Sequence, residues 1–93
     1  MQLKGEYKRL FESTSALLFR HDPIGLNYET NIGEYDHEAR TVLPRLTSCN
    51  SAEAVERVLH EEFCRWFTTK TAGPQERYRA AAVELWQLWQ VHQ

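Results

Sequence analysis

Apolar residues recur at helical spacing along most of the chain, separated by polar and charged positions. At about 100° per residue, the apolar positions near the N-terminus share one face and predict a helix over residues 3–20. A second stripe, spaced i, i+4, i+7, i+8 and i+11, starts at Tyr35 and predicts a helix over residues 36–47. Asp36 is its expected N-cap, since a carboxylate there can accept from the free amides of the first turn. Pro44 removes one helical hydrogen bond, so this helix should kink or shorten there.

Two further stripes complete the helical pattern. Ser51 is placed to cap a helix over residues 52–68. Pro74 lies in the first turn of a helix predicted over residues 74–91, where proline is tolerated. No segment shows the strict alternation of a strand. The sequence therefore predicts an all-α fold, a compact bundle of about four helices forming a single domain over residues 1–93.

The stretch HDPIGLNYETNIGEYDHEA, residues 21–39, interrupts the helical pattern. The residue before Pro23 is pushed out of the helical region, so the first helix should end there. Turn-forming residues mixed with apolar ones predict an ordered loop over residues 21–35 that packs over one end of the bundle. The alternative is a binding loop, because rigid scaffolds often carry binding residues on loops. The candidate binding residues are His21, Asp22, Asn27, Tyr28, Glu34 and Asp36.

Three segments, HDPIGLN, GEYDHEARTVLPRL and SAEAVERVLHEEFCRWF, carry a resemblance over about residues 20–67. They resemble a group of small uncharacterised bacterial proteins with an Asp-Pro-Ile-Gly motif, a Glu-Tyr-Asp motif and a helix that ends in an aromatic pattern. A proline often follows the Tyr-Asp pair in that group, whereas this chain has His37. The resemblance implies a helical, cytosolic, bacterial protein. It implies no catalytic residue, because the group has no established activity.

Composition and charge narrow the class of protein. The formal net charge is −2 with interleaved signs, which argues against a dedicated nucleic-acid binder. No apolar stretch approaches the roughly 18 residues that a membrane span needs. Cys49 and Cys64 are too few for a disulfide framework, so a reduced cytoplasmic protein is expected.

Glu62 falls in the middle of the apolar stripe of the third predicted helix. A carboxylate there must reach water, find a partner or become protonated. We predict that it is buried and paired with His21, a tyrosine hydroxyl or an arginine. The alternative is that Glu62 lies at the edge of the bundle and bends towards solvent.

The other residues that could bind a metal or act in catalysis do not form a recognisable site in the sequence. His60 and Cys64 are four residues apart, a spacing that could grip a metal, but two ligands do not make a zinc site. Cys49 has no base near it in the sequence. Acidic residues crowd the loop over residues 21–38, where they could hold a cation or act as acid and base. No nucleophile, base and orienting group can be identified together, so no catalytic residue, metal or cofactor is assigned.

The last predicted helix has a wider apolar arc than docking on one side requires, because Trp86, Leu88 and Trp89 broaden it. Partly exposed aromatics are typical interface anchors, so these three residues are the candidate interface. The expected function is non-enzymatic binding of a second copy or of another protein. One alternative is an immunity-like protein that neutralises a toxin; another is an enzyme or metal-dependent protein built on the acidic loop.

Overall fold

The computed structural model describes residues 3–23 and 35–92, with side chains from Tyr7 onwards. Every element in these ranges is helical, so the predicted all-α bundle is confirmed. The four longer α-helices are α1 (Leu3–His21), α2 (Asp36–Val42), α3 (Ala52–Phe67) and α5 (Arg79–Val91).

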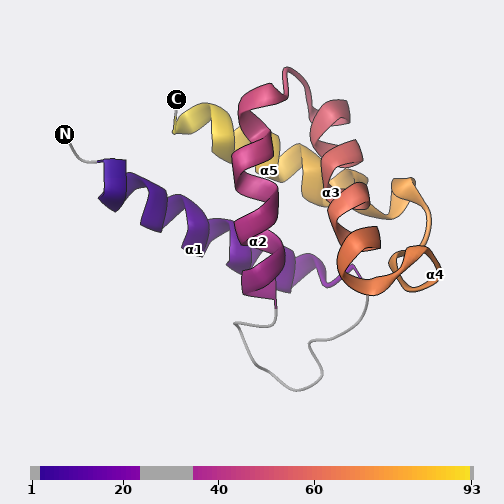
Figure 1. Cartoon of the computed structure of the whole chain (residues 1–93). Helices are drawn as coiled ribbons and strands as arrows, with labels where there is room; N and C mark the ends of the chain where they lie inside the picture. Colours follow the sequence, from indigo (N-terminus) through magenta and orange to yellow (C-terminus); the bar gives the residue numbers. More distant parts are fainter. Residues whose placement is uncertain (1–2, 24–34, 93) are drawn as a thin grey trace.

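The four helices form a closed ring of neighbours. The contacts run from α1 to α2, from α2 to α3, from α3 to α5 and from α5 back to α1, and α3 with α5 is the most extensive pair. Figure 1 shows α2 and α3 antiparallel at the front, crossing α1 and α5 behind them. Each helix therefore buries an apolar stripe between two neighbours, and a band of its surface stays free.

The second helix changes form at the proline, as predicted. It is α-helical from Asp36 to Val42 and continues as a 3₁₀ helix, η3 (Leu43–Ser48), with Pro44 in its first turn. The predicted role of Asp36 is wrong, because Tyr35 is the N-cap and no side chain caps this helix. The Asp36 carboxylate instead accepts a hydrogen bond from the Ser15 hydroxyl of α1.

The connection after α3 contains a short helix that the sequence pattern did not predict. Ser51 caps α3 as expected, accepting from the Ala54 amide at 3.1 Å. The helix ends at Phe67, and Thr68 follows at φ +79°. A short helix, α4 (Thr69–Ala72), then packs against α3.

The last predicted helix has two parts. It begins after Pro74 as a 3₁₀ turn, η4 (Gln75–Tyr78), and becomes α5 at Arg79. The Tyr78 hydroxyl donates to the carbonyl of Ala72 at 2.6 Å, which ties η4 to α4. Burial raises the pKa of this hydroxyl to about 12, so it stays protonated and keeps donating.

An aromatic cluster occupies the centre of the core. Phe63 of α3 is fully buried, with its ring centroid 5.1 Å from that of Tyr78. The rings of Tyr35 and Phe67 each lie 5.7 Å from Phe63, both tilted. Three segments that are distant in sequence therefore meet at one side chain.

Candidate functional site

The two ends of the predicted loop are tied to the bundle by polar contacts. Asp22, at φ +47°, accepts from the Tyr35 hydroxyl at 2.7 Å, so the end of α1 is joined to the start of α2. His21 Nε2 lies 2.9 Å from a Glu84 oxygen on α5, and Arg20 donates to the same carboxylate. The hydrogen bond from Arg20 is the largest cause, and that from His21 the next, of a Glu84 pKa below its ordinary value.

These contacts give the described loop residues a structural role. His21 contacts Glu84 on α5. Asp22 instead contacts Tyr35 at the start of α2, so the two candidate residues belong to separate contacts. The remaining candidates of the predicted binding loop, Asn27, Tyr28 and Glu34, lie outside the described residues, as does most of the loop over residues 21–35.

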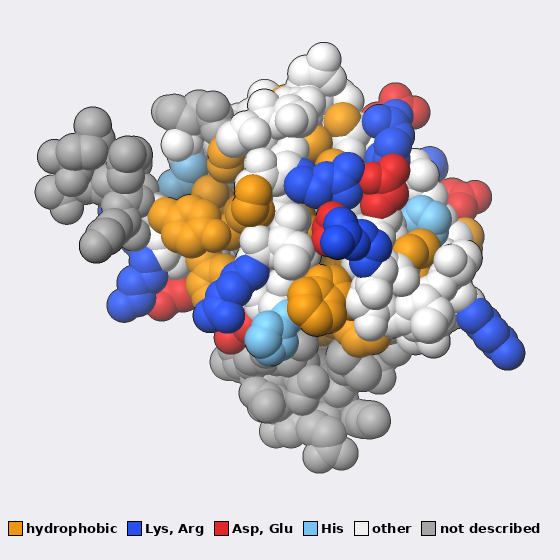
Figure 2. Space-filling model, viewed as in Figure 1, with side chains coloured by type: hydrophobic (Ala, Val, Ile, Leu, Met, Phe, Trp, Pro, Cys, Tyr) orange, Lys and Arg blue, Asp and Glu red, His pale blue; other side chains and the backbone are white. Residues whose placement is uncertain are grey.

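Glu62 is buried, with 2% of its surface exposed, and its partner is an arginine. Arg45 of η3 donates to Glu62 Oε2 at 3.1 Å, and Arg65 Nη1 lies 3.6 Å from the same oxygen. Arg45 also pairs with Glu61 at 2.7 Å. Figure 2 shows blue and red side chains next to one another over α3, where this network lies. The buried carboxylate is paired with two arginines at the surface of the fold, whereas His21 contacts Glu84.

A second buried carboxylate, Glu56, holds the other side of α3 to η4 and α5. Burial by itself raises the pKa of Glu56, but the hydrogen bonds from Arg79 at 3.1 Å and Gln75 at 3.2 Å outweigh it. The pKa of Glu56 in the folded state is therefore below its ordinary value of 4.5.

A lowered pKa makes the stability of the fold depend on pH. The unfolded chain takes up the Glu56 proton first as the pH falls, so this contribution is complete above pH 4.5 and is lost below it. We expect Glu56→Gln to flatten the loss of unfolding free energy as the pH falls below 4.5. Urea unfolding at a series of pH values measures this. Glu12→Gln on the exposed face of α1 is the control, and an unchanged slope in Glu56→Gln would contradict the assignment.

His60 and Cys64 do come together, but not as a reactive pair. His60 Nε2 lies 2.9 Å from the carbonyl oxygen of Gly73 and 3.5 Å from the sulfur of Cys64. Because a carbonyl oxygen only accepts, this nitrogen carries the proton and donates it. It cannot then take the thiol proton, as the base of a Cys–His pair must.

Over residues 3–23 and 35–92, no three His, Cys, Asp or Glu side chains lie close enough to hold a metal ion. No helix in the described part of the chain is long and apolar enough to cross a membrane.

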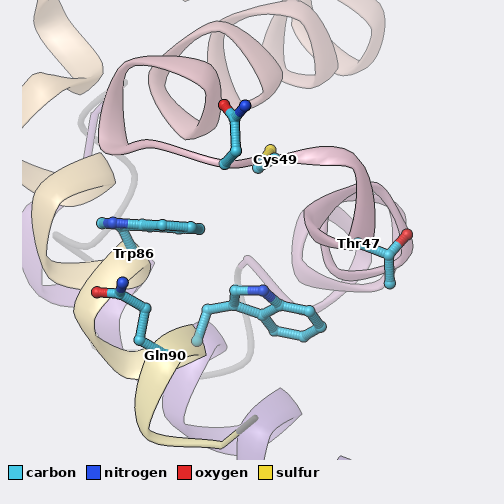
Figure 3. Close-up of a pocket in the computed structure, with 6 residues that line it drawn as sticks. Thr47, Cys49, Trp86 and Gln90 are labelled. Atoms are coloured by element: carbon cyan, nitrogen blue, oxygen red, sulfur yellow. The ribbon is translucent and has the colours of Figure 1, made fainter.

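A groove of about 410 Å³ lies between the C-terminal half of α5 and the turn from η3 to α3. We call it the tryptophan groove, and it is lined by Thr47, Cys49, Asn50, Trp86, Trp89 and Gln90. Figure 3 shows the Trp86 ring reaching from α5 into the space beside the Cys49 segment, with Thr47 and Gln90 at its edges.

The tryptophan groove contains no ionised lining residue. Burial raises the pKa of the Cys49 thiol, although Arg45 and Arg57 act in the opposite direction. The thiol is therefore neutral at pH 7, and it is not an activated nucleophile. The groove is suited to apolar and amide groups.

The candidate interface residues all lie on α5, and none of the three is fully exposed. Trp86, Leu88 and Trp89 are half-buried and pack against the core, with the two tryptophans forming one wall of the groove. Sequence reasoning missed the more exposed apolar residues of the same helix, Val83 at 42% and Val91 at 80% exposed.

After Arg79, the exposed residues of α5 are all uncharged, and the one carboxylate beside them, that of Glu84, is paired with Arg20. We call the exposed set the α5 outer face, and it consists of Ala80, Val83, Gln87, Gln90 and Val91. The run after Glu84, LWQLWQVHQ, contains no lysine, arginine, aspartate or glutamate, and this was the signal that could have revealed the face.

The exposed face of α3 provides a contrast within the same molecule. Its i, i+4 ridge carries charges of alternating sign at Glu53, Arg57, Glu61 and Arg65. Such a ridge is well hydrated and costly to cover. The equivalent ridge of α5 reads Val83, Gln87 and Val91, which water solvates less well.

Comparisons of the chain with protein-family models, with curated protein sequences and with solved structures each find no match. The resemblance over residues 20–67 to a bacterial helical group stays a prediction.

Proposed function

We propose that this chain is a non-enzymatic protein-binding module that works through the α5 outer face and the adjoining tryptophan groove. The observation that carries the proposal is the uncharged α5 outer face, with Val83 and Val91 exposed on a helix whose other side is anchored in the core. Depletion of charge at the centre of a patch, with aromatic residues beside it, is typical of protein interfaces.

The groove gives this surface a place for an anchor residue. Trp86 and Trp89 offer aromatic area held in place by the core, and Thr47, Asn50 and Gln90 offer neutral hydrogen-bonding groups at the rim. Interface energy is concentrated in such pockets, where a partner side chain is desolvated among aromatic groups. A protein segment with an apolar side chain and few charges fits this surface.

The proposal includes a cytoplasmic location. Both cysteines of the chain, Cys49 and Cys64, are free thiols. Free half-buried thiols suit a reducing compartment, where disulfides are rare.

Affinity capture from a lysate of the cells that encode the protein tests the proposal. The baits are the wild-type chain, Val83→Glu and the control Ala16→Glu, which places the same charge on the exposed face of α1. We expect Val83→Glu to reduce a retained protein about tenfold or more, because it buries an unpaired charge at the contact. Ala16→Glu should retain it fully. Equal retention by all three baits, or no retained protein, would contradict the proposal.

A further inference from the structure

We infer that the partner of the α5 outer face is a second copy of this chain, docked antiparallel so that Gln87 lies on the two-fold axis. The inference builds on the proposed function and names the partner for the same surface. Its evidence is the charge and the spacing of the exposed side chains on α5.

The absence of charge on the α5 outer face allows two copies of this face to meet. In a two-fold interface the same patch meets itself, so any net charge on it is repelled by its own copy. The α5 outer face has none, and its polar side chains, Gln87 and Gln90, are amides. An amide carries both donors and acceptors, so it can pair with its own symmetry copy.

The spacing of the face is symmetric. Val83, Gln87 and Val91 follow one another at intervals of four and form a single i±4 ridge, with the valines about 6 Å to either side of Gln87 along the helix. A two-fold axis through Gln87 therefore places Val83 of one copy opposite Val91 of the other, twice. The two Gln87 side chains meet at the centre.

The row of residues beside Val83, Gln87 and Val91 can receive the same ridge of the second copy. Trp86 and Gln90 lie four residues apart, beside the valine ridge, and both line the tryptophan groove. When i±4 ridges of two helices interdigitate, the ridge of each copy rests against the neighbouring row of the other. The valine ridge of one copy would thus cover the exposed edge of the groove in its partner.

The position of Arg79 favours antiparallel over parallel pairing of the two α5 helices. Arg79 is the preceding member of the same ridge, four residues before Val83. In a parallel pairing Arg79 would face Arg79 of the other copy, a like-charge contact that disfavours the complex. In the antiparallel pairing it lies beyond Val91 of the other copy, and the two helix dipoles oppose one another favourably.

A charge-rescue experiment tests both the partner and the direction. Val83→Glu and Val91→Lys each place a charge against a valine of the identical copy. Both positions are exposed, so folding should persist, which circular dichroism checks. Each variant alone should weaken the dimer at least about tenfold, because the charge is buried without a partner. Mass is measured by size exclusion with light scattering.

The mixture of the two variants separates the outcomes. In the antiparallel dimer, the carboxylate introduced at position 83 of one chain meets the ammonium introduced at position 91 of the other. The remaining pair is valine with valine, so mixing should restore the dimer. No rescue, or an equal loss of the dimer in the control Ala16→Glu, would overturn the inference.

A monomeric wild-type chain would overturn the inference as well. If lysate capture still depends on Val83 in that case, the proposed function stands without a second copy as the partner. If capture also fails, both the inference and the proposed function are rejected.

Discussion

Phe63→Ala is expected to remove about 3–5 kcal/mol from the free energy of unfolding. Phe63 is fully buried and lies within 5.7 Å, between ring centroids, of three other aromatic rings. Truncation leaves a cavity that α2, α3 and η4 cannot all collapse to fill. A domain of 93 residues has a total stability of about 5–14 kcal/mol, so this loss is a large fraction of it.

Urea unfolding followed by circular dichroism measures this loss. Phe67→Ala is the matched control, because Phe67 belongs to the same cluster but is only half-buried. It should cost clearly less, on the order of 1–2 kcal/mol. If the two variants lose the same free energy, Phe63 is not the centre of the core.

Arg45→Met is expected to cost about 1–3 kcal/mol. The substitution removes the 3.1 Å hydrogen bond to the buried Glu62 oxygen while keeping most of the aliphatic packing. The cost is lower than for a fully buried pair, because Arg45 is 40% exposed and Arg65 stays 3.6 Å from the carboxylate.

A double-mutant cycle isolates the pair. Adding Glu62→Gln to Arg45→Met should recover part of the loss, because the buried group is then neutral. Arg65→Met is the control, since Arg65 is 77% exposed and farther from Glu62, and it should cost little. Equal losses for the two arginines would show that Glu62 has no preferred partner.

The long apolar stripes of the sequence were enough to predict the four main helices, because each of these helices is stabilised mainly by burying its apolar stripe in the core. They could not predict α4, whose four residues have no periodicity and which depends on packing against α3 and on the bond from Tyr78 to Ala72. Trp66 shows what an apolar stripe cannot predict. The stripe identifies the apolar face of a helix, but not which of its residues a neighbouring element covers. Trp66 continues the α3 stripe but is 44% exposed, donates to the Thr41 hydroxyl and has its ring tilted against that of His37.

The candidate site was predictable in outline only. The position of Glu62 in a stripe indicated a pairing requirement, but Arg45 as its partner depends on how η3 turns after Pro44. The tryptophans drew attention to the last helix. The groove beside them depends on the turn at Cys49, which only the assembled fold brings against α5.

Sedimentation equilibrium of the wild-type chain, from micromolar to millimolar concentration, tests the central claim most directly. The claim that the α5 outer face binds a second copy predicts a mass that rises with concentration from 11.0 kDa towards twice that value. It also predicts that Val83→Glu stays near 11.0 kDa where the wild-type chain does not. A wild-type mass that stays at the monomer value up to millimolar concentration would contradict the claim.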